Sequence, residues 1–198
     1  MAAIEWIAAL AGLICVWLTI RQNVWCWPIG LVQVVLFVFV FFQARLYSDV
    51  ILHVVYIFLQ FYGWYYWLYG GRDRDELPVT RFSLPQAIAW CATVVGGTGL
   101  WGLAMATWTD AASPFVDAFI AVASLVAQWL LARKKLESWY FWIVVDVVGI
   151  GLFYQRELYP TAGLYAVFLG LAIYGCLQWR KSMRSEANSE LLAEGETS

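Results

Sequence analysis

The sequence predicts an all-α integral membrane protein with seven transmembrane helices. Of its 198 residues, 63% are hydrophobic and only 13% are charged, which is about half the charged share of a soluble domain. Seven apolar stretches approach the roughly 20 residues that a membrane-spanning helix needs. An internal repeat relates the first three stretches to the last three. We therefore expect two parallel three-helix repeats joined by a connector helix.

The apolar stretches place the helices along the chain. The predicted spans cover residues 4–20, 27–42, 50–69, 84–106, 115–132, 139–154 and 161–179. The second and sixth are short, but their aromatic ends can lie at the membrane interface. The first has neither a basic n-region nor a small-residue cleavage site before a soluble domain, so we expect a span rather than a signal peptide. Residues 185–198 are polar and lack aromatic residues, which predicts a disordered acidic cytoplasmic tail.

The repeat appears when the sequence is shifted by 112 residues, without a gap. Each half then reads W-x9-W-x15-Q-x2-L-Y-x15-G-x3-W, beginning at Trp17 and at Trp129. Several Trp pairs in one register are an improbable result of chance. We expect repeat one over about 3–72, the connector over 84–106 and repeat two over 115–184. Three helices per repeat and one connector make the halves parallel, with an axis along the membrane normal.

The loop charges predict the orientation of the bundle. The side that holds the first, third, fifth and C-terminal connections carries ten Lys and Arg residues, whereas the opposite side carries only Arg45 and Arg156. Cytoplasmic loops carry the excess of Lys and Arg in membrane proteins. The sequence therefore predicts an outside N-terminus and a cytoplasmic C-terminus.

The third stretch carries a polar and aromatic stripe. His53, Tyr56, Gln60, Gly63 and Trp67 recur at spacings that place them on one face of a helix. The other faces of this helix are apolar, which is typical of a helix that is deeply buried or in a membrane. We therefore expect the stripe to face inward, toward the site that the protein uses.

Two carboxylates lie within the predicted spans. Asp146 shares a helix face with Trp139 and Trp142, and a buried carboxylate costs several kcal/mol unless it faces a cavity, pairs or takes a proton. Capping of backbone groups or a bond to a tyrosine is the alternative for Asp146. Asp117 lies near the start of its span, where the helix dipole favours a carboxylate. Proton-coupled transport would require one of these groups to titrate and is the less favoured hypothesis.

The remaining candidates are glutamines and aromatic residues. Gln can both donate to and accept from hydroxyl groups, and aromatic faces attract cations by about 0.5–2 kcal/mol. Such a cavity suits a flat ring, a hydroxylated sugar and a positive charge. Bonding between helices is the alternative for Gln60 and Gln128. The candidate substrate-binding residues are Gln33, Tyr56, Gln60, Trp64, Gln128, Trp139, Trp142 and Asp146. The aromatic belt is expected at span ends, in Trp17, Trp25, Trp27, Trp67, Trp108 and Trp179.

Other classes of protein lack their required residues. No predicted span contains the lysine of a retinal protein, and no Walker A motif indicates direct use of ATP. His53 is the only histidine and there is no GxSxG sequence, which argues against a hydrolase or a zinc site. The four cysteines form no CxxC pair, so neither a metal nor a redox cofactor is expected. No basic stripe indicates nucleic acid. A scaffold protein would not explain Gln and Asp groups in register with Trp.

Four segments resemble PnuC-type vitamin transporters, which are usually assigned to nicotinamide riboside or nicotinamide mononucleotide. The segments are QFYGWYYW, ESWYFWIVVD, LYPTAGLY and the G-x3-W before Arg180 and Lys181. The resemblance spans residues 4–181 and implies a three-plus-one-plus-three fold like that of SWEET proteins. It further implies facilitated diffusion of nicotinamide riboside across the cell inner membrane, trapping by a cytoplasmic kinase, and a trimer as one possible assembly.

The substrate stays open between three vitamins. Members of the family also carry thiamine or riboflavin. The Asn-x-x-Trp motif that accompanies riboside binding is absent, because the only asparagines are Asn23 and Asn188. Asp146 lies where the resemblance places a ligand-contacting polar residue in the sixth helix. Nicotinamide riboside is the first hypothesis, and thiamine or riboflavin is the alternative.

Overall fold

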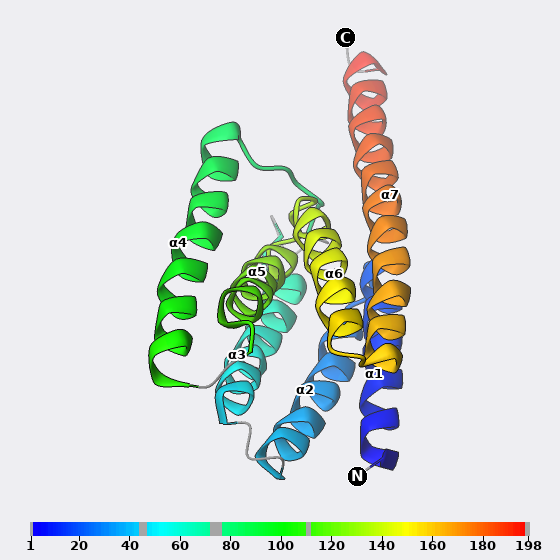
Figure 1. Cartoon of the computed structure of the whole chain (residues 1–198). Coiled ribbons are helices and arrows are strands. Elements are labelled where there is room, and N and C mark those ends of the chain that lie inside the picture. Colours follow the sequence, from blue (N-terminus) through cyan, green and yellow to red (C-terminus); the bar gives the residue numbers. More distant parts are fainter. Residues whose placement is uncertain (1, 44–46, 72–76, 110–111, 197–198) are drawn as a thin grey trace.

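The described residues form seven α-helices (Figure 1). The computed structural model describes residues 2–43, 47–71, 77–109 and 112–196. The helices are α1 (Ala2–Ile20), α2 (Cys26–Gln43), α3 (Tyr47–Tyr69), α4 (Leu84–Trp108), α5 (Pro114–Ala132), α6 (Ser138–Gln155) and α7 (Tyr159–Glu196). Each predicted span corresponds to one of these helices. α4 and α5 both have a proline in their first turn, where the missing N–H costs no helical hydrogen bond.

Five of the seven helices are long and apolar enough to cross a membrane, namely α2, α4, α5, α6 and α7. α1 contributes the shorter apolar stretch Trp6–Ile20. α3 has 23 residues, but its tyrosines, tryptophans, His53 and Gln60 lower its mean hydropathy. Helices suit the bilayer because each satisfies its own backbone hydrogen bonds.

The last helix is longer than the sequence predicts. α7 continues through Glu196, whereas a disordered tail was expected from residue 185. The segment from residue 185 is rich in Glu, Ala and Leu, all of which have high helix propensity. A helix that is already nucleated extends at low cost through such residues. Polarity alone therefore did not distinguish a solvated helix from a disordered tail.

Helices adjacent in sequence pack together within each half of the chain. α2 packs against α1 and α3, and α6 packs against α5 and α7. The halves meet where α3 packs on α5 and where α1 packs on α7. α4 packs on α5 at the edge of the bundle, and the two termini lie at opposite ends (Figure 1).

Four tryptophans form the centre of the main hydrophobic cluster. Trp27 meets Trp67 edge-on at 5.4 Å between ring centroids, and Trp139 meets Trp179 in the same way at 5.4 Å. A 6.1 Å contact between Trp67 and Trp179 joins the two pairs. The prediction that Trp27, Trp67 and Trp179 belong to the aromatic belt is wrong, because all three are buried. Their positions at helix ends resemble belt positions, but they point into the bundle. Three other predicted belt residues are exposed, namely Trp17, Trp25 and Trp108.

Two tryptophan hydrogen bonds cross between the halves. Trp67 Nε1 donates to the carbonyl oxygen of Leu131 at 3.3 Å, and Trp179 Nε1 donates to that of Thr19 at 3.1 Å. Both donors and both acceptors are related by the 112-residue shift. The contact between the halves is therefore reciprocal at this end of the bundle.

Non-glycine residues with positive φ end two equivalent helices. Gln22 follows α1 with φ 55°, and Lys134 follows α5 with φ 47°. In each case the next residue donates its N–H five residues back, as Asn23 does to Leu18. This pattern satisfies the last carbonyl groups of a helix by a Schellman turn. The equivalent turns leave α1 and α5 in the same geometry.

The segment after α3 lies across the turn between α5 and α6. Thr80 N donates to the Lys134 carbonyl at 3.1 Å, and Leu136 N donates to the Thr80 carbonyl at 2.9 Å. The buried Lys134 Nζ donates to the Leu77 carbonyl at 2.8 Å. The segment 77–82 therefore covers the end of the second half.

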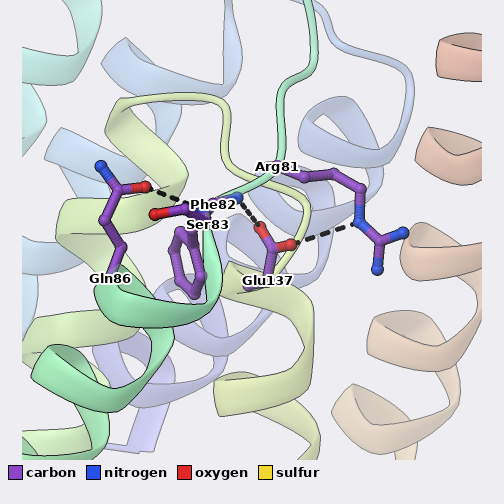
Figure 2. Close-up of polar contacts among 5 residues, drawn as sticks. All are labelled: Arg81, Phe82, Ser83, Gln86 and Glu137. Carbon is purple, nitrogen blue, oxygen red and sulfur yellow. Dashed lines mark hydrogen bonds and ion pairs between the residues drawn. The ribbon is translucent and has the colours of Figure 1, made fainter.

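Glu137 holds the same segment in place by two polar contacts just before α4 begins (Figure 2). One carboxylate oxygen accepts the backbone N–H of Phe82 at 3.3 Å, and the other pairs with Arg81 Nε at 3.3 Å. The Ser83 N–H donates to the side-chain oxygen of Gln86 at 3.0 Å, which caps the first turn of α4. Glu137 thus connects the beginning of α6 to the beginning of α4.

Candidate functional site

The stripe on α3 faces the interior, as the sequence predicts. Gln60, Gly63 and Trp67 are buried, whereas Phe58 on the opposite face is 69% exposed. The His53 ring packs against that of Phe41 in a tilted arrangement, with 4.8 Å between ring centroids. α2 supplies the surface against which the stripe packs.

Gln60 carries an unsatisfied acceptor inside the bundle. Its side chain is 7% exposed and fits against Gly30 of α2, where an added Cβ would lie 2.5 Å from Gln60 Nε2. The buried Gln60 Oε1 has no hydrogen-bond partner among the described residues. A buried polar atom without a partner costs about 1–3 kcal/mol. This amide oxygen is therefore a candidate acceptor for a hydrogen bond from a ligand.

Asp146 is a buried carboxylate inside the bundle. It lies on α6 and is 4% exposed. No hydrogen bond or ion pair joins it to another residue in the described part of the chain. Tyr165 of α7 lies in its neighbourhood. Among the expected alternatives, the structure therefore shows neither a capping bond nor a bond to tyrosine.

Tyr165 connects Asp146 to the other half of the bundle. Its ring packs on Gly149, where an added Cβ would lie 2.5 Å from a ring carbon. Tyr56 of α3 lies in the same region, and its hydroxyl group lies beside Ser124. Four helices thus converge here, and the structure brings the predicted Tyr56 and Asp146 into one region.

Sequence reasoning did not select Tyr165 as a site residue. A signal for it was available, because the 112-residue shift aligns Tyr165 with His53 of the α3 stripe. The surroundings repeat as well. Phe153 lies 5.0 Å from the Tyr165 ring, as Phe41 lies 4.8 Å from His53.

The other two glutamines lie in different parts of the bundle. Gln128 is buried on α5, four residues after Ser124 and therefore on the same helix face. Gln33 of α2 is half-buried and packs on α1, where a Cβ added to Gly12 would lie 2.6 Å from Gln33 Nε2. Gln128 thus shares the face that approaches Tyr56, whereas Gln33 lies between α1 and α2.

The three candidate tryptophans have unequal access to this region. Trp139 is 2% exposed and is packed against Gly175 and Trp179, and its Nε1 has no partner among the described residues. Trp142 is half-buried, one helical turn before Asp146. It packs against both the tryptophan cluster and a second hydrophobic cluster, which α4, α5 and α6 form. Trp64 lines a separate groove of about 220 Å³, together with Trp25. Trp142 is therefore the candidate ring nearest to the carboxylate along its helix.

Asp117 lies in the first turn of α5, where a carboxylate complements the helix dipole. Its Oδ2 also pairs with Arg156 Nη2 at 2.8 Å. The ion pair joins the beginning of α5 to the turn between α6 and α7. Asp117 therefore has a structural partner, unlike Asp146.

Comparisons with known proteins agree with this architecture. The family model described as nicotinamide mononucleotide transporter matches residues 2–181. The nicotinamide riboside transporter PnuC of Escherichia coli (strain K12) is 29% identical, and the match covers 95% of this chain and 89% of the relative. The riboflavin/roseoflavin transporter RibM of Streptomyces davaonensis is 27% identical, with 96% and 90% covered.

A solved structure of a vitamin B3 transporter PnuC has the same fold. It superposes with a TM-score of 0.75 at 25% identity, covering 93% of this chain and 83% of the other. The family match covers nearly the whole helical bundle, and the helices suit a multi-pass membrane protein. The chain therefore belongs to the nicotinamide mononucleotide transporter family of membrane transporters.

Proposed function

We propose that the protein imports nicotinamide riboside by facilitated diffusion, and that a cytoplasmic kinase traps the product by phosphorylation. The observation that carries the proposal is the buried Asp146 carboxylate, which has no cationic partner in the described residues. A positively charged pyridinium ring would supply that partner. The relatives named as nicotinamide riboside transporters support the same substrate.

The surrounding residues suit the neutral parts of this ligand. Trp142 offers a ring face close to Asp146, to which a cationic ring would be attracted. The unpaired Oε1 of Gln60 would accept a hydrogen bond from a carboxamide or a ribose hydroxyl group. Gln128 and Tyr56 would contact the sugar from α5 and α3. In this arrangement no ligand contact is assigned to Gln33 between α1 and α2, to Trp64 in its separate groove or to the packed Trp139.

The alternative substrates differ in charge. Thiamine carries a cationic ring and would satisfy Asp146 equally well, whereas riboflavin has no fixed positive charge. The riboflavin/roseoflavin transporter among the relatives keeps this alternative open. The charge of Asp146 therefore distinguishes flavin transport from transport of the other two vitamins.

Calorimetric titration of the purified protein with nicotinamide riboside, thiamine and riboflavin tests the proposal. We expect nicotinamide riboside to bind, and Asp146→Asn to weaken that binding by about 2 kcal/mol or more, because an interacting charge is lost. Asp117→Asn is the matched control, since Asp117 is paired with Arg156. Binding of riboflavin alone, or an Asp146→Asn variant with unchanged affinity, would refute the substrate assignment.

Transport itself is proposed to follow from the two halves of the bundle. The helices would form two parallel repeats with the N-terminus outside, and rocking of these repeats would expose the site to each side in turn. Uptake into proteoliposomes should stop when the concentrations are equal and should not depend on a pH gradient. Accumulation driven by a pH gradient would instead indicate proton coupling. A trimeric assembly is an expectation from the family resemblance.

A further inference from the structure

A polar cavity opens at the junction of α1 and α7. Its volume is about 520 Å³, and it lies apart from the region around Asp146. The charged side chains in its lining are Arg21 and Lys181, both cationic. Gln22, Gln178 and Ser182 add hydrogen-bonding groups, and Gln22 Nε2 donates to Ser182 Oγ at 3.1 Å. The cavity therefore suits an anion with several acceptor oxygens.

The equivalent position in the other half is filled by the chain itself. The 112-residue shift relates Gln22 to Lys134, and both have positive φ. Over Lys134 lies the segment 77–82, which accepts the Lys134 ammonium at the Leu77 carbonyl. In the first half the chain after α3 ends its helix at Tyr69 and returns over Lys134. In the second half α7 continues as a helix past Trp179, so no equivalent segment covers Gln22 among the described residues. The open cavity is thus a consequence of the different connections after α3 and within α7.

The position of the cavity along the helices corresponds to lipid headgroups. The end of α1 carries the exposed Trp17, and Trp25 is exposed just after it. Exposed tryptophans at helix ends lie at the level of the lipid headgroups. In the orientation proposed above, this is the cytoplasmic leaflet, where anionic lipids attract basic residues.

We propose that this cavity binds the phosphate group of an anionic phospholipid headgroup. The Arg21 guanidinium would donate two hydrogen bonds to phosphate oxygens, and the Lys181 ammonium would approach as a point charge. The ligand would join α1 of one half to α7 of the other, close to the bond from Trp179 Nε1 to the Thr19 carbonyl. Bound lipid would therefore stabilise the contact between the halves at this end.

Thermal unfolding of the purified full chain, with soluble short-chain lipids, tests the inference. Dihexanoyl phosphatidylglycerol should raise the midpoint of unfolding more than dihexanoyl phosphatidylcholine at equal concentration. The Arg21→Gln/Lys181→Gln variant should need roughly 30-fold more of the anionic lipid to reach the same midpoint. The reason is that each basic residue near an anionic headgroup raises the affinity about fivefold, and two residues are removed. The matched control is Arg180→Gln/Arg184→Gln, which removes the same charge from exposed positions of α7 outside the cavity lining. It should respond as the wild type does.

Three outcomes would overturn the inference. The first is an unchanged response to the anionic lipid in Arg21→Gln/Lys181→Gln, and the second is an equally weakened response in the control variant. The third is a rise of the unfolding midpoint with inorganic phosphate alone that equals the rise with the lipid. The last outcome would assign the cavity to a soluble phosphate. Binding of nicotinamide riboside to the same samples separates this test from that of the proposed function, because the cavity variants leave the region around Asp146 unaltered.

Discussion

Two equivalent glycines make room for two equivalent tryptophan rings. A Cβ added to Gly175 would lie 2.6 Å from the outer ring carbons of Trp139, and one added to Gly63 would lie 2.1 Å from the corresponding carbon of Trp27. Both rings are buried, and their edges pack against further tryptophans. Neither ring can withdraw without opening the contact between α6 and α7 or between α2 and α3. We therefore expect Gly175→Ala and Gly63→Ala to destabilise the protein.

The magnitude follows from two opposing contributions. Excess volume in a packed core typically costs about 1–3 kcal/mol, and the contacts here are closer than a core can absorb. Alanine is favoured over glycine in a helix by roughly 1 kcal/mol, which offsets part of this cost. A net loss of about 2 kcal/mol would lower the midpoint of unfolding by about 4–8 °C in a chain of this size. Thermal unfolding in detergent, followed by circular dichroism, measures this shift.

Gly170→Ala is the matched control on the same helix. No atom lies within 4 Å of the Cβ position at Gly170, so only the favourable helix propensity remains and the midpoint should stay the same or rise. Trp139→Phe removes the outer ring carbons that the new methyl group meets, and it should restore part of the stability of Gly175→Ala. Equal midpoints for Gly175→Ala and Gly170→Ala, or no recovery in the double variant, would refute the reasoning.

Three further substitutions test individual contacts by chemical or thermal unfolding. Trp179→Phe keeps a ring but removes one of the two donors to the Thr19 carbonyl, which still accepts the Gln22 N–H, so a loss of about 0.5–1.5 kcal/mol is expected; a neutral effect would mean that the bond between the halves contributes nothing. Asp117→Asn removes the ion pair with Arg156, which should cost under about 1 kcal/mol and become undetectable near 1 M salt; a loss that persists in high salt would contradict this. Glu157→Gly relieves a positive φ of 59° and should stabilise by about 1 kcal/mol, whereas destabilisation would show that the side chain makes an important contact.

The positions of the helices could be predicted because hydropathy and length determine them in a membrane protein. Each apolar stretch became one helix. The aromatic residues at span ends were ambiguous for a physical reason. A tryptophan at an interface and a tryptophan at the end of a packed core have the same sequence position, and only the partner helix distinguishes exposed Trp25 from buried Trp27. The continuation of α7 was missed because polar composition indicates solvation, not the absence of a helix.

The burial of Asp146 and of the α3 stripe could be predicted from the sequence, whereas the contacts around them could not. Asp146 and Gln60 were visible as polar residues among apolar neighbours. Burial of Trp139 against Gly175 depends on a contact between α6 and α7 that no local pattern contains. The convergence of Tyr165 with Tyr56 likewise depends on how the two halves meet. Residues that act through long-range packing therefore need the structure.

The repeat separates packing residues from candidate substrate residues. The shift by 112 residues pairs identical residues where the helices contact one another, as with Gly63 and Gly175, and the reciprocal tryptophan bonds follow the same register. Apart from Trp139, which aligns with Trp27, the candidate substrate residues do not follow it. Gln60 aligns with Ala172, and Asp146 aligns with Val34.

This asymmetry has a physical reason in the proposed transport cycle. A nucleoside has a charged ring at one end and a sugar at the other, so a symmetric cavity would leave some of its groups unpaired. Rocking of two halves requires the opposite, namely matched surfaces that pack equally well when they exchange positions. In the first half Gly30 makes room for Gln60, whereas in the second half the equivalent positions hold Trp142 and Ala172. Large and small residues are thus reversed between the halves, so that a polar side chain of α3 in the first half corresponds to an aromatic side chain of α6 in the second.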